Sequence, residues 1–183
     1  MNILLTLVNK HQYLRIQIDE YKFQYIFIYV IVSERLAVKG AFSSSIHHNT
    51  YDATNAIDGN LENFFHSNDN EKNKNPWLQV ELKEICVIHS IIVFNRKNCC
   101  GERTKNMRVG VGFTKFVKGM ETLDLRKNEV CATYEGPGKN GEEISIHCKA
   151  PMRGQYVSVQ LMQTSNAILN LGEIEIYGQP GKI

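Results

Sequence analysis

The stretch YVSVQL, residues 156–161, indicates the fold class because its apolar and polar residues alternate strictly. In a β-strand its two valines and Leu161 would lie on one face, and Ser158 and Gln160 on the other. The stretch EIEIYG, residues 173–178, repeats this alternation. We therefore expect strands that each bury one side only.

The same period of two recurs along most of the chain, whereas helical periodicity is weak. Turn-forming stretches such as GPGKNGE, residues 136–142, separate the apolar runs. This spacing is typical of an antiparallel β-sandwich and not of alternating strands and helices. Besides the two stretches above, we expect strands at WLQVEL (77–82), VIHSIIVF (87–94), MRVGVGF (107–113) and EISIHC (143–148).

Length and charge narrow the possible functions. The chain has 183 residues, of which 43% are hydrophobic and 22% charged, with a formal net charge of +2. This length favours one domain with a real core. Basic residues form no dense run, so we do not expect nucleic-acid binding.

The first 35 residues differ from the rest. Residues 23–33, FQYIFIYVIVS, are almost wholly apolar, yet eleven residues cannot span a bilayer and they lie too far from Met1 for a signal peptide. Three interpretations remain open for residues 1–35: an atypical targeting segment, an extra β-rich arm, or sequence outside the mature domain. Residues 179–183 form a short C-terminal tail.

Five cysteines are many for a cytosolic chain of this size, and they lack the CxxC spacing of a zinc site. An oxidising compartment is therefore expected. Cys131 and Cys148 enclose sixteen residues, and a disulfide between them would stabilise the fold by about 3 kcal/mol. Cys86 lies in an apolar run and is expected to be a buried free thiol.

The loop NRKNCCGERTKN, residues 95–106, places two arginines around a Cys-Cys pair. Two guanidinium forks from one loop can hold vicinal hydroxyl groups or an anion. Cysteines bonded to each other would present a flat sulfur surface, which suits the apolar face of a sugar ring. Alternatively, both arginines are solvated, and Cys99 or Cys100 pairs with Cys86.

Six ordered stretches resemble the signatures of the F-type lectins, relatives of the coagulation factor 5/8 C-terminal (discoidin) domain. The resemblance implies a discoidin-like β-jelly-roll sandwich over residues 36–178 that binds L-fucose on exposed loops and holds a structural calcium ion. It also suggests innate recognition of microbial glycans. The stretches are LAVKGAFSSS (36–45), NAIDGN (55–60), NPWLQVEL (75–82), NRKNCCGER (95–103), RGQYVSVQL (153–161) and LNLGEIEIYG (169–178).

The sugar motif of that family reads His, twenty-six residues, Arg, one residue, Asp, four residues, Arg or Lys. The resemblance places its arginines on Arg96 and Arg103, puts Asn98 at the Asp position, and implies a disulfide between Cys99 and Cys100 that packs against the sugar. Asn98 lacks the carboxylate but keeps an oxygen acceptor of similar shape.

The histidine of the motif is displaced in this chain. Its counted position holds Asp69, and the nearest histidine is His66, three residues earlier. The 61–75 loop could be arranged so that His66 reaches the site, or Asp69 could accept a sugar hydroxyl and shift the specificity. A third interpretation leaves His66 as an ordinary surface residue.

The resemblance also implies a calcium site made of hard oxygen ligands around a glycine-containing loop. The alternative is that NAIDGN is only a turn, in which Asp58 caps its own backbone and Gly59 supplies an unusual dihedral. The implied ligands are Asn55, Asp58, Asn60, Ser67, the backbone carbonyl of Gly172, and Glu173.

Taken together, the residues and the resemblance predict a secreted, calcium-stabilised lectin for fucosylated or related glycans. Homo-oligomerisation is expected because single sugar sites are weak. The alternative is a discoidin-fold module with a degenerate site that binds another glycan, a protein or a lipid. No nucleophile and base stand together, so no enzymatic activity is expected, and membranes would be reached only through their glycans.

Overall fold

The computed structural model describes residues 12–16, 28–69, 74–117, 127–163 and 166–181, and it confirms the all-β prediction. The described chain contains β-strands with short 3-10 helices between them. The elements from β3 onward are β3 (Glu34–Arg35), β4 (Val38–Ser43), η1 (Asn49–Tyr51), η2 (Ala53–Ala56), β5 (Phe65–His66), β6 (Trp77–Asn95), η3 (Gly101–Arg103), β7 (Met107–Gly112), β8 (Glu129–Tyr134), β9 (Glu143–Leu161) and β10 (Asn170–Pro180).

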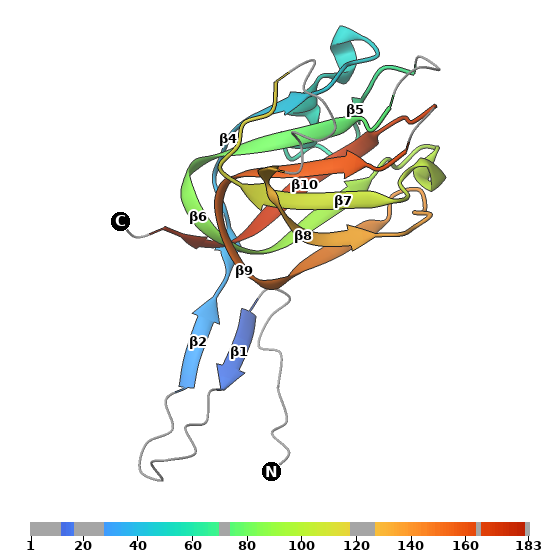
Figure 1. Ribbon diagram of the computed structural model, residues 1–183. Helices are drawn as coiled ribbons and strands as arrows, with labels where there is room; N and C mark the ends of the chain where they lie inside the picture. The colour runs from blue at the N-terminus through green and yellow to red at the C-terminus, as the bar shows by residue number, and fades with distance from the viewer. Residues whose placement is uncertain (1–11, 17–27, 70–73, 118–126, 164–165, 182–183) are drawn as a thin grey trace.

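Two long antiparallel strands, β6 and β9, run through both layers of the sandwich (Figure 1). In one layer the first half of β6 pairs with β4 and with the second half of β9. The second half of β9 also pairs with β7, and β7 pairs with β8. In the other layer the second half of β6 pairs with β10 and with the first half of β9. Strands β3 and β5 both pair with β10.

The length of these strands differs from the sequence prediction. Separate strands were expected at 77–82 and 87–94, but β6 continues through both, and β9 likewise joins 143–148 to 156–161. Register shifts in the β6–β9 pairing fall between Glu81 and Cys86 and between Ile88 and Ser90. Bulges of this kind bend a strand without ending it, so one strand can serve both layers.

The expectation that the strands bury one side only is wrong. Val157, Val159 and Leu161 lie in the core as predicted, but Ser158 and Gln160 are buried as well. The polar face that they share with Gln79 is covered by residues 113–117, whose backbone bonds the Gln79 carboxamide at two points. Tertiary packing therefore buries a face that the sequence pattern marks as polar.

The N-terminal segment forms a separate hairpin. Strands β1 (Gln12–Ile16) and β2 (Ile28–Val32) pair antiparallel with each other, and Figure 1 shows them outside the sandwich. The remaining residues of this segment, 1–11 and 17–27, lie outside the described residues. In the part of the chain that the structure describes, no helix has the length and apolarity needed to cross a membrane.

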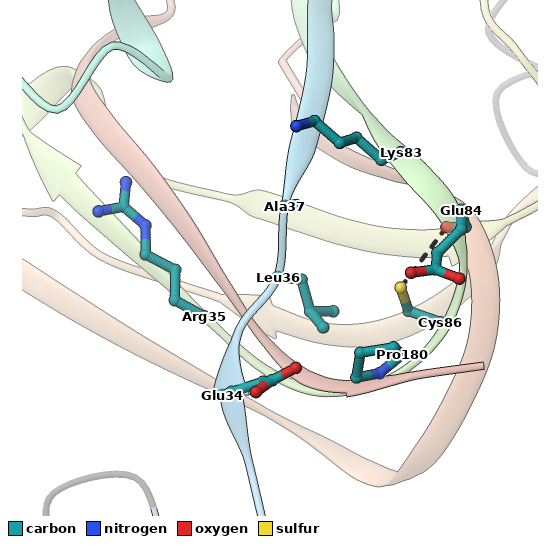
Figure 2. A pocket seen from close by; sticks show the side chains of 8 residues that line it. All are labelled: Glu34, Arg35, Leu36, Ala37, Lys83, Glu84, Cys86 and Pro180. Carbon is teal, nitrogen blue, oxygen red and sulfur yellow. Dashed lines mark hydrogen bonds between the residues drawn. The ribbon is translucent and has the colours of Figure 1, made fainter. Parts of the chain in front are cut away.

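The cysteines pair as expected from the sequence and, for Cys99 and Cys100, as the resemblance implied. Disulfides join Cys99 to Cys100 and Cys131 to Cys148, while Cys86 is a buried free thiol. Cys86 lines a pocket of about 320 Å³ with residues 34–37, 83, 84 and 180 (Figure 2). Asn95 lies nine positions further along β6, about 30 Å away at ~3.3 Å per residue, so the alternative pairing with Cys99 or Cys100 is wrong.

Candidate functional site

A single buried asparagine organises the loop that carries both arginines. Asn95 ends β6 and is only 2% exposed. Its Nδ2 donates to the carbonyl oxygens of Gly101 at 2.9 Å and Lys139 at 3.0 Å. Its Oδ1 accepts from the Arg96 backbone N–H at 3.0 Å and from the Thr104 hydroxyl at 2.9 Å. The loop is therefore tied at both ends to one side chain.

The turn after the vicinal disulfide requires glycine. Cys100 has a left-handed φ of 65° and leads directly into η3. A Cβ on the next residue, Gly101, would lie 2.3 Å from the carbonyl carbon of Lys139. Because glycine has no side chain, the start of η3 can approach the 139–140 segment closely, and any other residue at this position would clash.

Arg96 is held in place on two sides. Its Nε donates to Oδ1 of Asn98 at 2.6 Å, and its guanidinium carbon lies 3.8 Å from the centroid of the Phe64 ring. Burial lowers the pKa of Arg96 from its usual value, and the charge of Arg103 acts in the same direction. Within the described residues neither guanidinium forms an ion pair, so both can still donate to oxygen acceptors.

The second arginine faces a histidine. Arg103 Nη1 lies 3.4 Å from Nε2 of His66, and Nδ1 of that histidine lies 2.6 Å from the Ser67 carbonyl oxygen. Since a carbonyl only accepts, Nδ1 carries the proton and Nε2 offers a lone pair toward Arg103. Burial lowers the pKa of His66, and the charges of His47 and the two arginines add to that effect. The imidazole is therefore neutral at pH 7.

An aromatic wall that the sequence interpretation missed surrounds His66. Tyr51 and Phe64 stack with ring centroids 4.8 Å apart, and the His66 centroid lies 6.0 and 6.4 Å from theirs. The His47 ring lies 5.1 Å from that of His66. Phe64 also supports Arg96, so this wall fixes both polar groups. The adjacent Phe-Phe-His in the sequence was the available signal, since Phe64 and His66 share one face of an extended chain.

Asp69, at the counted histidine position, sits at the edge of this group. Its Oδ1 lies 3.1 Å from Nδ1 of His47, and both side chains are largely exposed. The structure therefore brings His66, and not Asp69, against Arg103.

The expected calcium loop meets Glu173 of β10. This glutamate is 1% exposed; its Oε2 accepts from the Gly59 backbone N–H at 3.0 Å, and its Oε1 lies 3.3 Å from Nη2 of Arg35. Burial raises the pKa of Glu173 to about 7, and the nearby Asp58 carboxylate also raises it. A buried carboxylate beside a second carboxylate is an arrangement that a divalent cation can compensate.

The loop also has the features of an ordinary turn. Asp58 accepts from the backbone N–H of Asn60 at 2.8 Å, and Gly59 has a φ of 79°. Asn55 donates to the carbonyls of Thr50 and Phe64, which anchors the loop to the residue directly before β5. Among the described residues, no group of three or more His, Cys, Asp or Glu is arranged for a metal, so amide and backbone oxygens would have to complete the ligand set.

Of the other implied ligands, Ser67 directly follows β5 and Gly172 lies in β10. Ser67 Oγ accepts from the Leu169 backbone N–H at 3.0 Å, and Gly172 lies in a bulge between Leu171 and Glu173. Ser67 is therefore bonded to the residues that lead into β10, and Gly172 directly precedes Glu173 in that strand.

Comparisons with known proteins agree with this geometry. A family model described as the NedA-like, galactose-binding domain of the F5/F8 type C group matches residues 55–159. The fucolectin of Anguilla anguilla is 34% identical over 151 residues, covering 78% of this chain and 90% of that protein. Fucolectin-3 of Anguilla japonica is 35% identical over 141 residues, covering 76% and 71%.

A solved structure shows the same fold. The crystal structure of an F-lectin (fucolectin) from the serum of the striped bass, Morone saxatilis, superposes with a TM-score of 0.66 at 26% identity. The match covers 79% of this chain and 49% of the striped-bass chain, so the present chain spans about half the length of that lectin.

Proposed function

This chain belongs to the F-type lectin family, and we propose that it binds L-fucose or a related terminal sugar on glycans through Arg96, Arg103 and His66. The observation that carries the proposal is the 3.4 Å approach of Arg103 Nη1 to the unprotonated Nε2 of His66. Relatives that match most of the chain are named fucolectins, which supports the choice of fucose.

The chemistry of a sugar hydroxyl fits between these groups. A hydroxyl can accept from the Arg103 guanidinium while it donates to Nε2 of His66, so it would replace one long hydrogen bond by two shorter ones. A neighbouring hydroxyl can accept from Arg96, whose orientation is fixed by Asn98 and Phe64. The Cys99–Cys100 disulfide would supply the apolar surface for the ring face or methyl group.

The direct test is retention on immobilised L-fucose at pH 7.5, with elution by free L-fucose and with immobilised D-mannose as the control matrix. We expect retention that weakens as the pH falls below the lowered pKa of His66. Protonation would remove the Nε2 lone pair and place an imidazolium beside two guanidinium groups. Absence of retention on fucose at pH 7.5 would contradict the proposal.

We also propose a structural calcium ion at residues 55–60, Ser67, the Gly172 carbonyl and Glu173. The buried Glu173 carboxylate supports it, because a cation would neutralise a charge that has little access to water and offset its repulsion from the exposed Asp58 carboxylate. When bound, the ion would join the loop to β10 and hold the aromatic wall in place. It would stabilise the site and would not contact the sugar.

Calcium at a hundred times its dissociation constant should stabilise the protein by about 2.7 kcal/mol, raising the melting temperature by roughly 5 to 10 °C. Glu173→Gln should remove most of this shift. Glu175→Gln is the matched control, since Glu175 is also paired with Arg35 but does not bond the 58–60 loop. An equal calcium shift in the Glu173 variant would exclude the assigned site.

Three further properties belong to the same proposal. The two disulfides support secretion into an oxidising environment. Assembly of several copies would give a weak sugar site useful avidity on a glycan-covered surface. The proposed activity is binding and includes no catalytic step.

A further inference from the structure

We propose that Asn170 is a positioning residue of the sugar site, an inference that rests on the proposed function. Asn170 begins β10 and is 0% exposed. Neither Oδ1 nor Nδ2 of its side chain has a hydrogen-bond partner among the described residues. A buried carboxamide with all its hydrogen-bonding capacity unused is uncommon in folded proteins and points to a partner in another state.

The strand register places this carboxamide at the site. Asn170 pairs with His66, and the next residue, Leu171, pairs with Phe65. Residues directly opposite on antiparallel strands project from the same face. Phe65 and Leu171 both lie in the core, so Asn170 and His66 project together from the other face.

On the other side of β10, the strand register places Arg96 beside Asn170. Leu171 also pairs with Asn95, the last residue of β6, so the following residue, Arg96, comes beside Asn170 on the face away from the core. The stacking of Arg96 on Phe64, which shares the face of His66, agrees with this placement. Asn170 therefore lies in one row between two of the three groups assigned to the sugar.

The energetic cost of this arrangement falls on the free protein. An unpaired buried amide is unfavourable, whereas leucine, of similar size and shape, would avoid that cost. The other two asparagines that are buried in the described part of the chain are bonded: Asn95 uses its whole carboxamide, and Asn128 bonds the backbone of Thr114 at both N–H and carbonyl. Asn170 is the exception, and it is the one in the row with His66.

A bound sugar would give the carboxamide its partner. With the guanidinium of Arg96 still on the Phe64 face and its Nε still bonded to Asn98, a bound sugar hydroxyl would turn one of its Nη groups within reach of Oδ1 of Asn170. The hydrogen bond forms in the complex and not in the free protein, so it adds to affinity without adding to stability. Asn170 orients the arginine and does not touch the ligand.

The test compares melting temperature with L-fucose affinity, measured by calorimetry at fixed calcium. Asn170→Leu should melt at or above the temperature of the parent and bind L-fucose about tenfold more weakly. Asn170→Asp keeps an oxygen acceptor of the same size, so it should bind more tightly than the leucine variant. A leucine variant that binds like the parent would overturn the inference.

Asn128→Leu is the matched control because it removes a bonded buried asparagine away from the sugar loop. It should lower the melting temperature and leave the fucose affinity of the folded protein unchanged. If Asn170→Leu instead loses stability as Asn128→Leu does, Asn170 is bonded in the free protein and the inference is wrong. A parent protein that fails to bind fucose overturns the proposed function, and this inference with it.

Discussion

Arg103→Ala should abolish retention on immobilised L-fucose, with a loss of affinity of about a hundredfold. The variant removes a charged donor to the sugar and the group that faces Nε2 of His66. A hydrogen bond to a charged group contributes about 1.5 to 3 kcal/mol, so the loss of one or two accounts for this factor. Arg96→Ala should have a similar effect, because its guanidinium is preorganised by Phe64 and Asn98.

The control for both variants is Arg153→Ala. Arg153 is an exposed residue of β9 that pairs with Val87, near the end of the sandwich opposite the sugar loop. The three variants carry the same change in charge, and all should keep the parent's melting temperature within a few degrees. Only the variants at Arg96 and Arg103 should lose retention on immobilised L-fucose. If either of them is retained as well as the parent, the site has been misplaced.

The sandwich and the loop that carries the arginines were predictable because their signals are local. Alternation of period two marked the interior of β6, β7, β9 and β10, and hydrophobic burial on one face enforces that period. The spacing of Arg96, Asn98 and Arg103 within one connection was enough to place them together. Neither inference required knowledge of distant contacts.

The sequence left open whether His66 or Asp69 reaches the site, because the position of His66 depends on the pairing of β5 with β10. Counting along the chain reached Asp69, whereas the register that brings His66 opposite Asn170 joins residues about a hundred positions apart. The same pairing creates the unpaired carboxamide of Asn170. Such long-range contacts leave no local periodicity in the sequence, so only the folded chain shows them.

Asn95→Leu should lower both stability and sugar binding. Leucine would leave the carbonyl oxygens of Gly101 and Lys139, the Thr104 hydroxyl and the Arg96 N–H without their partner at a buried position. Unsatisfied buried groups of this kind should reduce the free energy of unfolding by roughly 3 kcal/mol, a fall in melting temperature of about 6 to 12 °C. Fucose binding should be lost as well, because the loop that holds Arg96 and Arg103 would no longer be fixed.

Asn140→Ala provides the graded comparison. Its Oδ1 accepts one hydrogen bond from the Gly101 backbone N–H at 2.8 Å, but Asn140 is exposed. Water can therefore replace the lost partner, and the variant should melt within about 1 to 2 °C of the parent. A leucine variant of Asn95 as stable as the parent would show that the loop is held by other contacts. The Asn95 variant should lose both melting temperature and fucose affinity, whereas the variants at Arg103 and Asn170 should lose fucose affinity alone. This difference would distinguish the residue that builds the loop from those that act on the sugar, because only a residue that holds the loop changes the stability of the free protein as well as the complex.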